Sequence, residues 1–224
     1  GTVGKWLVSH PDVDLVAMTG SSATGKHILA TSAPSLKRVV LELGGKDPMV
    51  VFDDASIEKA AKDAVAFSLS NTGQVCCSVE RVIVAEQIRD AFETKVVEVA
   101  KTFQVGNGLE DGVLVGPLVS PMQRDHVKTQ VDKALEAGAK LLYQGEVPAD
   151  SDGNFYPVTV LSNLSKDMDV FCAETFGPVV ALSTFDGTEG EAIRIANDTE
   201  YGLGGSIYTQ DMERAARMAK QIDS

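Results

Sequence analysis

The amino-acid sequence predicts an α/β protein in which the strands of a parallel sheet alternate with covering helices. An apolar run at residues 13–18 reaches a Gly/Ser turn, a helical pattern follows, and a second apolar run covers residues 38–43. This order of strand, glycine turn, helix and strand is a βαβ unit, which requires a parallel sheet with covered faces. Short apolar runs and helical patterns continue to alternate over the rest of the 224 residues. The fold class therefore follows from one βαβ unit and the alternation after it.

The individual elements follow from local patterns. The first helix is expected to start at residues 26–30 and to end at Pro34, since proline lacks the N–H group that a helix interior needs. A helix over residues 56–69 separates a polar from an apolar face. The polar set is Glu58, Lys59, Lys62 and Asp63, and the apolar set is Ile57, Ala61, Val65 and Leu69. We also expect helices after residue 85 to about 101, at 121–137 and near 191–196, strands at 48–52, 81–85, 158–161, 179–185 and 205–208, a Gly-rich connection leading to 116–117, and a surface loop or hairpin at 144–156.

Composition excludes several classes of partner. The chain carries 20 Lys and Arg against 32 Asp and Glu, a net charge of −12, which argues against nucleic acid or an anionic membrane surface as partner. No apolar run approaches the roughly 18 residues that cross a bilayer. Three cysteines, two of them adjacent, make no disulfide framework. We therefore expect a soluble protein of a reducing intracellular compartment, the cytoplasm first, with mitochondrion and plastid left open.

Two strings carry residues suited to catalysis. Cys76 and Cys77 lie in a Gly/Ser/Asn/Thr loop directly after the helix of residues 56–69, where a reactive thiol would sit, and composition alone does not choose between them. Glu42 interrupts an otherwise apolar strand that ends at the glycine pair 44–45. Such a carboxylate either pairs with an arginine or backbone group, or becomes a general base whose pKa is raised by burial.

The turn at residues 20–26 allows a second hypothesis. It satisfies all but the last place of a phosphate-binding P-loop, and residues 49–54 mimic the apolar strand ending in acid that often accompanies one. His27, however, stands where Ser or Thr would hold Mg²⁺. A nucleotide-binding NTPase is therefore the alternative function. The histidines at 10, 27 and 126 are widely spaced, so we expect surface histidines and neither a metal site nor a Cys-His hydrolase.

Four motifs in order resemble the aldehyde dehydrogenase superfamily. In chain order they are the turn Thr19-Gly20-Ser21 closing on Gly25, Glu42-Leu43-Gly44-Gly45, Gly73-Gln74-Val75-Cys76, and Glu174-Thr175-Phe176-Gly177-Pro178. The resemblance implies part of a Rossmann-type dinucleotide-binding domain at residues 1–44 and an α/β catalytic domain at 45–224. It also implies that the chain is an internal part of a longer protein, inactive or weakly active alone, whose parent is a homodimer or homotetramer.

The resemblance implies a role for each motif. Cys76 rather than Cys77 is the nucleophile, because Gly73-Gln74-Val75-Cys76 fits the family pattern, and Cys77 and Cys172 are left as small structural hydrophobes. Glu42 is the general base for thioester hydrolysis. The cofactor is NAD or NADP, and the substrate is a small aldehyde. The residues expected to bind the cofactor are Gly20, Ser21, Thr24, Gly25, Leu43, Gly44, Glu174 and Phe176, with Glu174 on a ribose and Phe176 beside the nicotinamide. An inert structural relative is the remaining alternative.

Overall fold

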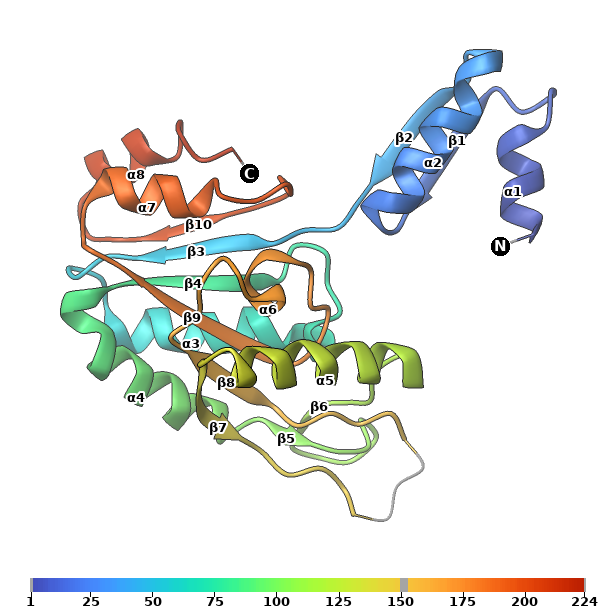
Figure 1. Cartoon of the computed structure of the whole chain (residues 1–224). Helices are drawn as coiled ribbons and strands as arrows, with labels where there is room; N and C mark the ends of the chain where they lie inside the picture. The colour runs from blue at the N-terminus through green and yellow to red at the C-terminus, as the bar shows by residue number, and fades with distance from the viewer. Residues whose placement is uncertain (1, 150–152, 224) are drawn as a thin grey trace. The chain divides into compact units, whose positions relative to one another are not determined.

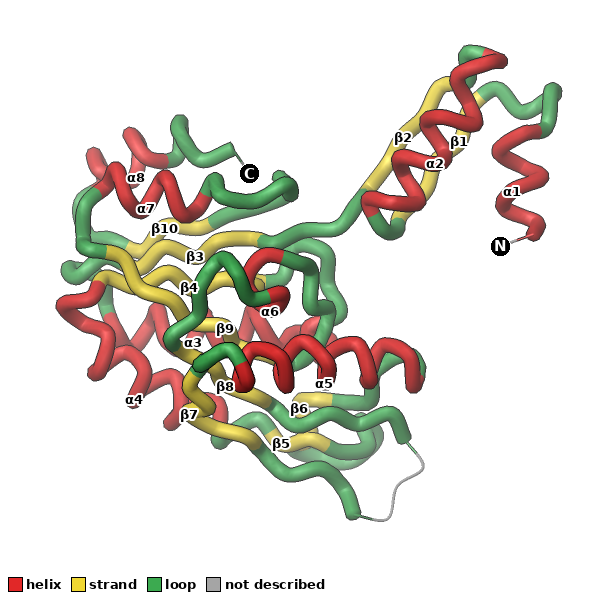
Figure 2. Tube along the Cα trace, in the orientation of Figure 1, coloured by secondary structure: helices red, strands yellow, loops and turns green. Residues whose placement is uncertain are grey.

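The computed structural model describes residues 2–149 and 153–223. The chain divides into two compact units, residues 1–44 and residues 45–224 (Figure 1). Both combine helices and strands, as the colouring of Figure 2 shows, which confirms the predicted α/β class. The assignment of the two units to cofactor binding and catalysis stays a prediction.

The first unit is the predicted βαβ arrangement, preceded by a helix. Its elements are α1 (Thr2–Ser9), β1 (Leu15–Thr19), α2 (Ser22–Ser32) and β2 (Arg38–Glu42). β1 and β2 pair in parallel, with Thr19 opposite Glu42. α2 ends before Pro34 as expected, but it begins four residues earlier than residue 26 because Ser21 caps it. The side chain of Ser21 accepts the N–H of Thr24, which satisfies a donor that the first helical turn leaves open.

The second unit is built on a six-stranded sheet in the order β10-β3-β4-β9-β8-β7. Its strands are β3 (Asp47–Val51), β4 (Val79–Ala85), β7 (Lys140–Gln144), β8 (Thr159–Ser162), β9 (Val179–Phe185) and β10 (Ser206–Tyr208). All neighbours are parallel except β7, which runs antiparallel to β8 at one edge. The central strands β3, β4 and β9 are almost continuously buried, as expected for a parallel sheet covered on both faces.

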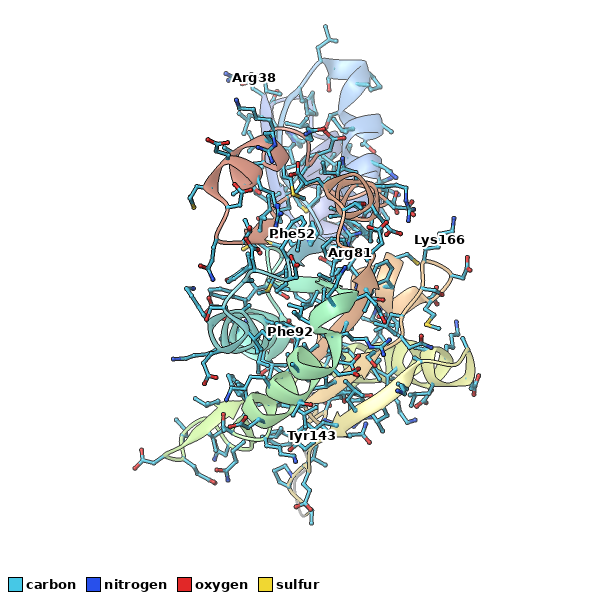
Figure 3. The ribbon with its side chains drawn as sticks, turned by 90° about the vertical axis from the view of Figure 1, so that its left-hand side faces the viewer. Arg38, Phe52, Arg81, Phe92, Tyr143 and Lys166 are labelled. Atoms are coloured by element: carbon cyan, nitrogen blue, oxygen red, sulfur yellow. The ribbon has the colours of Figure 1, made fainter. Side chains whose placement is uncertain are left out.

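Helices cover both faces of this sheet. The helices of the second unit are α3 (Ile57–Leu69), α4 (Arg89–Ala100), α5 (Pro121–Glu136), α6 (Asp169–Cys172), α7 (Glu189–Ala196) and α8 (Met212–Met218). α3 and α4 pack on the face that carries Met49 and Val51, while α7 and α8 pack on the face that carries Val50 and Phe52. Figure 3 labels Phe52 and Phe92, which belong to these two opposite cores. α5 and α6 complete the second face beside Leu161, Val179 and Ala181.

Some elements were not predicted. β5 (Gln104–Val105) and β6 (Val113–Val115) pair with each other inside the stretch expected to be a Gly-rich connection. Strands of two and three residues are too short to show a period of two in sequence. β7 was missed because its ends are the polar Lys140 and Gln144. In the expected loop at 144–156, Asp150, Ser151 and Asp152 lie outside the described residues.

Two kinds of feature are absent from the described residues. No helix within 2–149 and 153–223 is long and apolar enough to cross a membrane. Within the same ranges, no three His, Cys, Asp or Glu side chains cluster so that they could hold a metal ion. The three histidines are exposed, as expected.

Candidate active site

The turn between β1 and α2 lies at the carboxyl edge of the two-stranded sheet. The N–H of Gly20 donates to the backbone oxygen of Glu42 at 2.9 Å, which ties the ends of β1 and β2 together. Ser21 and Thr24 follow at the start of α2, with their hydroxyl oxygens 3.0 Å apart. Because backbone N–H groups of a first helical turn face an anion favourably, this edge suits a phosphate group. Ligands of open α/β sheets lie at such carboxyl ends.

Gly25 has a packing role. It is buried, and a Cβ atom there would lie 2.7 Å from Cδ2 of Leu43. A side chain at position 25 would therefore have to displace the end of the Leu43 side chain. Leu43 and Gly44 are both half-buried. Since α2 already begins at Ser22, Gly25 and Lys26 lie inside the helix and not in a loop that could wrap a phosphate.

The structure therefore opposes the P-loop hypothesis. A P-loop needs a glycine-rich loop of several residues before its helix, and only Gly20 and Ser21 separate β1 from α2. The acid after β3 also has a structural role. Asp54 accepts the hydroxyl of Thr209 at 2.8 Å and the N–H of Gln210 at 3.1 Å, which holds the chain between β10 and α8.

Glu42 is not buried, contrary to the expectation for a carboxylate in an apolar strand. Side chains along β2 alternate between exposed and half-buried, with Val39 and Leu41 half-buried. Glu42 shares the exposed face with Arg38 and Val40 and is the last residue of the strand. Its exposure follows from the period of two in a strand.

Cys76 occupies a turn between α3 and β4. The N–H of Ser78 donates to the oxygen of Val75 at 3.0 Å, so Cys76 and Cys77 are the two central residues of this turn. Cys76 is half-buried, whereas Cys77 and Cys172 are exposed. The expectation that Cys77 and Cys172 are small buried hydrophobes is thus wrong, because one lies at the tip of a turn and the other at the end of the four-residue helix α6.

The backbone before Cys76 adopts an uncommon conformation. Asn71, Thr72 and Gly73 have φ angles of 48°, 63° and 73°, in the left-handed region that costs non-glycine residues energy. The hydroxyl of Thr72 holds this segment: it accepts the N–H of Gly116 at 3.1 Å and donates to the Gly116 oxygen at 3.3 Å. The side chain of Gln74 accepts the N–H of Val119 at 2.9 Å.

Three of the sequence motifs meet at Gly45. A Cβ atom on Gly45 would lie 2.1 Å from the backbone oxygen of Cys76, so the two backbones are in direct contact. The N–H of Gly45 donates to Oε1 of Glu174 at 3.1 Å. Gly73 in turn lies against Gly177, the glycine that follows Phe176. The structure thus brings the cysteine loop, Gly45 and the segment Glu174–Phe176 together within the second unit.

Glu174 and Phe176 are half-buried at this meeting point. Burial raises the pKa of Glu174 above its ordinary value, and the N–H of Gly45 opposes that rise. Phe176 has a φ of 52°, which is unusual for a bulky residue. Its N–H donates to Oε1 of Glu80 at 2.9 Å. The Glu174 carboxylate and the Phe176 ring are therefore carried by a strained backbone segment, which the Glu80 side chain holds by a hydrogen bond.

The buried charged residues that fix this backbone were not predicted from the sequence. Lys46 and Glu80 are 1% and 6% exposed and form an ion pair at 2.6 Å. Burial lowers the pKa of Lys46, and the Glu80 carboxylate opposes that shift. Arg81, labelled in Figure 3, is fully buried and donates to the backbone oxygen of Lys46 at 2.9 Å. A signal was present: Lys46 directly precedes β3, and Glu80 and Arg81 are the second and third residues of the otherwise apolar β4.

Comparison with known proteins identifies the class. The aldehyde dehydrogenase family matches residues 1–224. A peroxisomal aminoaldehyde dehydrogenase 1 of Pisum sativum is 41% identical over 99% of this chain and 44% of its own length. The structure of a betaine aldehyde dehydrogenase from Staphylococcus aureus in complex with NAD⁺ superposes with a TM-score of 0.93 at 37% identity, covering 98% of this chain and 44% of that one. The structure of lactaldehyde dehydrogenase from Escherichia coli superposes with a TM-score of 0.93 at 40% identity. The match covers 99% of this chain and 46% of that one.

The chain belongs to the aldehyde dehydrogenase family, as its four motifs indicated. It spans less than half the length of these relatives.

Proposed function

We propose that the protein oxidises a small aldehyde to a carboxylate with NAD⁺ or NADP⁺, using Cys76 as nucleophile. The observation that carries this proposal is the contact at Gly45, which touches the backbone of Cys76 and donates to the carboxylate of Glu174. Gly45 thereby places the turn that carries a half-buried cysteine beside a carboxylate suited to a ribose diol. Membership of the family supports the same activity.

The residues present fit a dinucleotide. Oε1 of Glu174 accepts the N–H of Gly45, and since a carboxylate can accept about four hydrogen bonds, the group can also accept those of a ribose diol. In the first unit, the start of α2 with Ser21 and Thr24 offers backbone N–H groups and hydroxyls to a pyrophosphate. When bound, the nicotinamide accepts a hydride. The NAD⁺ complex of the Staphylococcus aureus relative supports this cofactor class.

The chain's own residues perform the covalent steps. The Cys76 thiolate forms a C–S bond with the aldehyde carbon, and the carbonyl π electrons move to oxygen. This tetrahedral adduct is needed because an aldehyde carbon has no electron pair to expel hydride. Loss of hydride leaves a thioester on Cys76. Glu42, in its proposed role, then takes a proton from water, the hydroxide attacks the thioester, and the C–S bond breaks to release the carboxylate and the thiolate.

The substrate is proposed only as a class. The relatives are named for an aminoaldehyde, betaine aldehyde and lactaldehyde, which are all small polar aldehydes. We propose an aldehyde of this kind. A homodimer or homotetramer and a reducing intracellular compartment stay predictions; the pea relative is named peroxisomal.

NAD(P)H formation by the natural full-length protein tests the proposal. Wild type is compared with Cys76→Ala and with Cys77→Ala as matched control, using the three aldehydes and both cofactors. We expect activity in wild type and Cys77→Ala and none in Cys76→Ala. Absence of activity with every pair, or full activity of Cys76→Ala, contradicts the proposal.

Alkylation of the folded protein tests the alternative of an inert relative. Cys77 and Cys172 are exposed, whereas Cys76 is half-buried. If accessibility alone set the rate of alkylation, Cys76 would be the slowest of the three thiols to react. Thiolate character rather than exposure governs the rate of alkylation. We expect iodoacetamide to modify Cys76 first, as followed by peptide mass spectrometry. Slower reaction at Cys76 than at Cys172 would favour the inert protein.

A further inference from the structure

Glu80 lies at an irregularity of β4, four residues after Cys76. In the pairing of β3 with β4, Asp47 is opposite Val79 but Pro48 is opposite Arg81, so Glu80 is an extra residue without a partner on β3. A bulge of this kind turns a side chain away from the regular alternation, and bulges are frequent next to active sites. Pro48 fits beside it because proline has no N–H to donate to the ladder. The bulge is thus the local cause of the direction that Glu80 takes.

The carboxylate of Glu80 receives three donors. Oε2 accepts Nζ of Lys46 at 2.6 Å and the N–H of Thr175 at 2.8 Å, and Oε1 accepts the N–H of Phe176 at 2.9 Å. Two successive peptide groups of the segment Glu174–Phe176 are therefore bound by one side chain. Hydrogen bonds to a charged acceptor are stronger than neutral ones. Glu80 therefore holds the segment through its backbone N–H groups.

A second side chain holds the same two residues from their carbonyl groups. Nε2 of Gln123, in the first turn of α5, donates to the backbone oxygen of Thr175 at 3.1 Å and to that of Phe176 at 3.0 Å. The N–H groups and the C=O groups of both residues are consequently fixed by different elements. A left-handed φ at a bulky residue such as Phe176 persists only where the surroundings determine it. Glu80 and Gln123 supply those surroundings.

Lys46 completes the arrangement by compensating the charge of Glu80. Its Nζ also donates to the backbone oxygen of Val170 at 2.9 Å and to Oγ1 of Thr175 at 3.1 Å, so its three donors are all used. A buried carboxylate without such a partner would be strongly unfavourable. Lys46 directly follows Gly45, the residue that contacts both Cys76 and Glu174. The pair therefore links the segment of the nucleophile to the segment of the proposed cofactor site.

We propose that Glu80 and Gln123 are positioning residues for cofactor binding, which hold the Thr175 and Phe176 peptides so that Glu174 and Phe176 face the dinucleotide, with Lys46 as the counter-charge of Glu80. The inference rests on the proposed function. Neither residue touches the reacting atoms. Replacing a positioning residue should change the affinity for the cofactor without a matching change in fold stability or in aldehyde binding.

The test compares four variants of the natural full-length protein with wild type: Glu80→Gln, Lys46→Met, the double variant of both, and Gln123→Leu. Calorimetric titration gives the dissociation constants of NAD⁺ and NADP⁺, thermal melting gives stability, and steady-state kinetics separate the KM of cofactor, the KM of aldehyde and kcat. Glu191→Gln is the matched control, since Glu191 also accepts a backbone N–H, that of Asp186 at 2.8 Å, but lies on α7.

We expect Glu80→Gln to raise the dissociation constant of the cofactor about tenfold or more, because an amide has one acceptor oxygen and places N–H donors against backbone N–H groups. The aldehyde KM should stay unchanged. The double variant removes both buried charges, so it should recover melting temperature over either single variant while cofactor affinity stays low. Gln123 is half-buried, and Gln123→Leu should weaken cofactor binding with little loss of stability.

If the double variant recovers both stability and cofactor affinity, the Lys46–Glu80 pair acts only by balancing two buried charges, and the proposal is overturned. A cofactor affinity in Glu80→Gln equal to that of wild type also overturns it. If neither Glu80 variant folds, Gln123→Leu decides, and unchanged affinity there overturns it. A wild type that binds neither cofactor contradicts the proposed function as well. A wild type that binds and turns over beside variants that bind equally well contradicts this inference only.

Discussion

Gly73 and Gly177 are in backbone contact: a Cβ atom on Gly73 would lie 2.0 Å from the backbone oxygen of Gly177. Gly177 is itself confined, since a Cβ atom there would lie 2.4 Å from Cγ2 of Val127 on α5. Side chains at either position would separate the loop that carries Cys76 from the segment that carries Phe176. Two glycines, one from each motif, are therefore the physical reason that these segments lie together.

Gly73→Ala should destabilise the protein and displace the cysteine loop. The φ of 73° is unfavourable for alanine, and the new methyl group would collide with backbone rather than with a movable side chain. Strain and overpacking together predict a loss of about 2–4 kcal/mol. Urea denaturation measures it. Gly108→Ala is the control, because a Cβ there meets nothing within 4 Å. Equal stability of the two variants would contradict the contact.

Thr72→Val should cost more than Thr72→Ser. The Thr72 hydroxyl bonds both the N–H and the oxygen of Gly116, and valine leaves these half-buried groups without that partner. Serine keeps the hydroxyl and removes a branch that is unfavourable at a φ of 63°. We expect valine to lose about 1–3 kcal/mol more than serine. Denaturation curves of the two variants give the difference directly, and a difference near zero would show that the hydroxyl contributes nothing.

Much of the fold could be predicted because its signals are local. The turn at Gly20, the stop at Pro34 and the helical spacing of Ala61, Val65 and Leu69 each depend on neighbours within a few residues, and the structure confirms all three elements. The two-stranded β5–β6 pair and β7 were missed because they are defined by partners elsewhere in the chain and not by their own pattern.

The candidate site divides in the same way. Cys76 and Glu174 belong to short motifs and were found from sequence, and their roles stay predictions. Glu80 and Gln123 were missed because they act on a segment about 95 and 50 residues away along the chain, a relationship that only the fold creates. The exposure of Glu42 shows the converse limit: an apolar strand in sequence does not say which of its residues the fold covers.

Arg81→Lys should be strongly destabilising although it keeps the charge. Arg81 is fully buried and donates to three backbone oxygens, those of Lys46 at 2.9 Å, Ile195 at 2.9 Å and Ala196 at 2.7 Å. Two of these lie in the last turn of α7, where the Ile195 oxygen also accepts a backbone N–H from the residues that follow the helix. A lysine ammonium cannot span the three acceptors as a planar guanidinium does. We expect the free energy of unfolding, measured by chemical denaturation, to fall by about 3–5 kcal/mol. The control Arg89→Lys, on the surface, should change it little. A loss below about 1 kcal/mol would contradict the role.

Asp47 should make stability fall as pH rises. Asp47 is 5% exposed and its Oδ1 accepts the N–H of Gly204 at 3.1 Å. Burial raises the pKa of Asp47 from 3.8 to about 6, with the charge of Glu80 acting in the same direction and Arg81 opposing it. The folded state then holds the proton more tightly than the unfolded state, so the contribution is full below about pH 4 and is lost as the pH rises through about 6.

Asp47→Asn removes this dependence because asparagine stays neutral and keeps an oxygen that can accept the Gly204 N–H. Relative to wild type, the variant should gain about 1–3 kcal/mol between pH 4 and pH 7. Urea denaturation of both proteins at several pH values gives the difference, with Asp53→Asn as control because Asp53 is exposed beside the same strand. A difference between wild type and Asp47→Asn that stays constant from pH 4 to pH 7 would show that folding does not raise the pKa of Asp47, and would contradict this prediction.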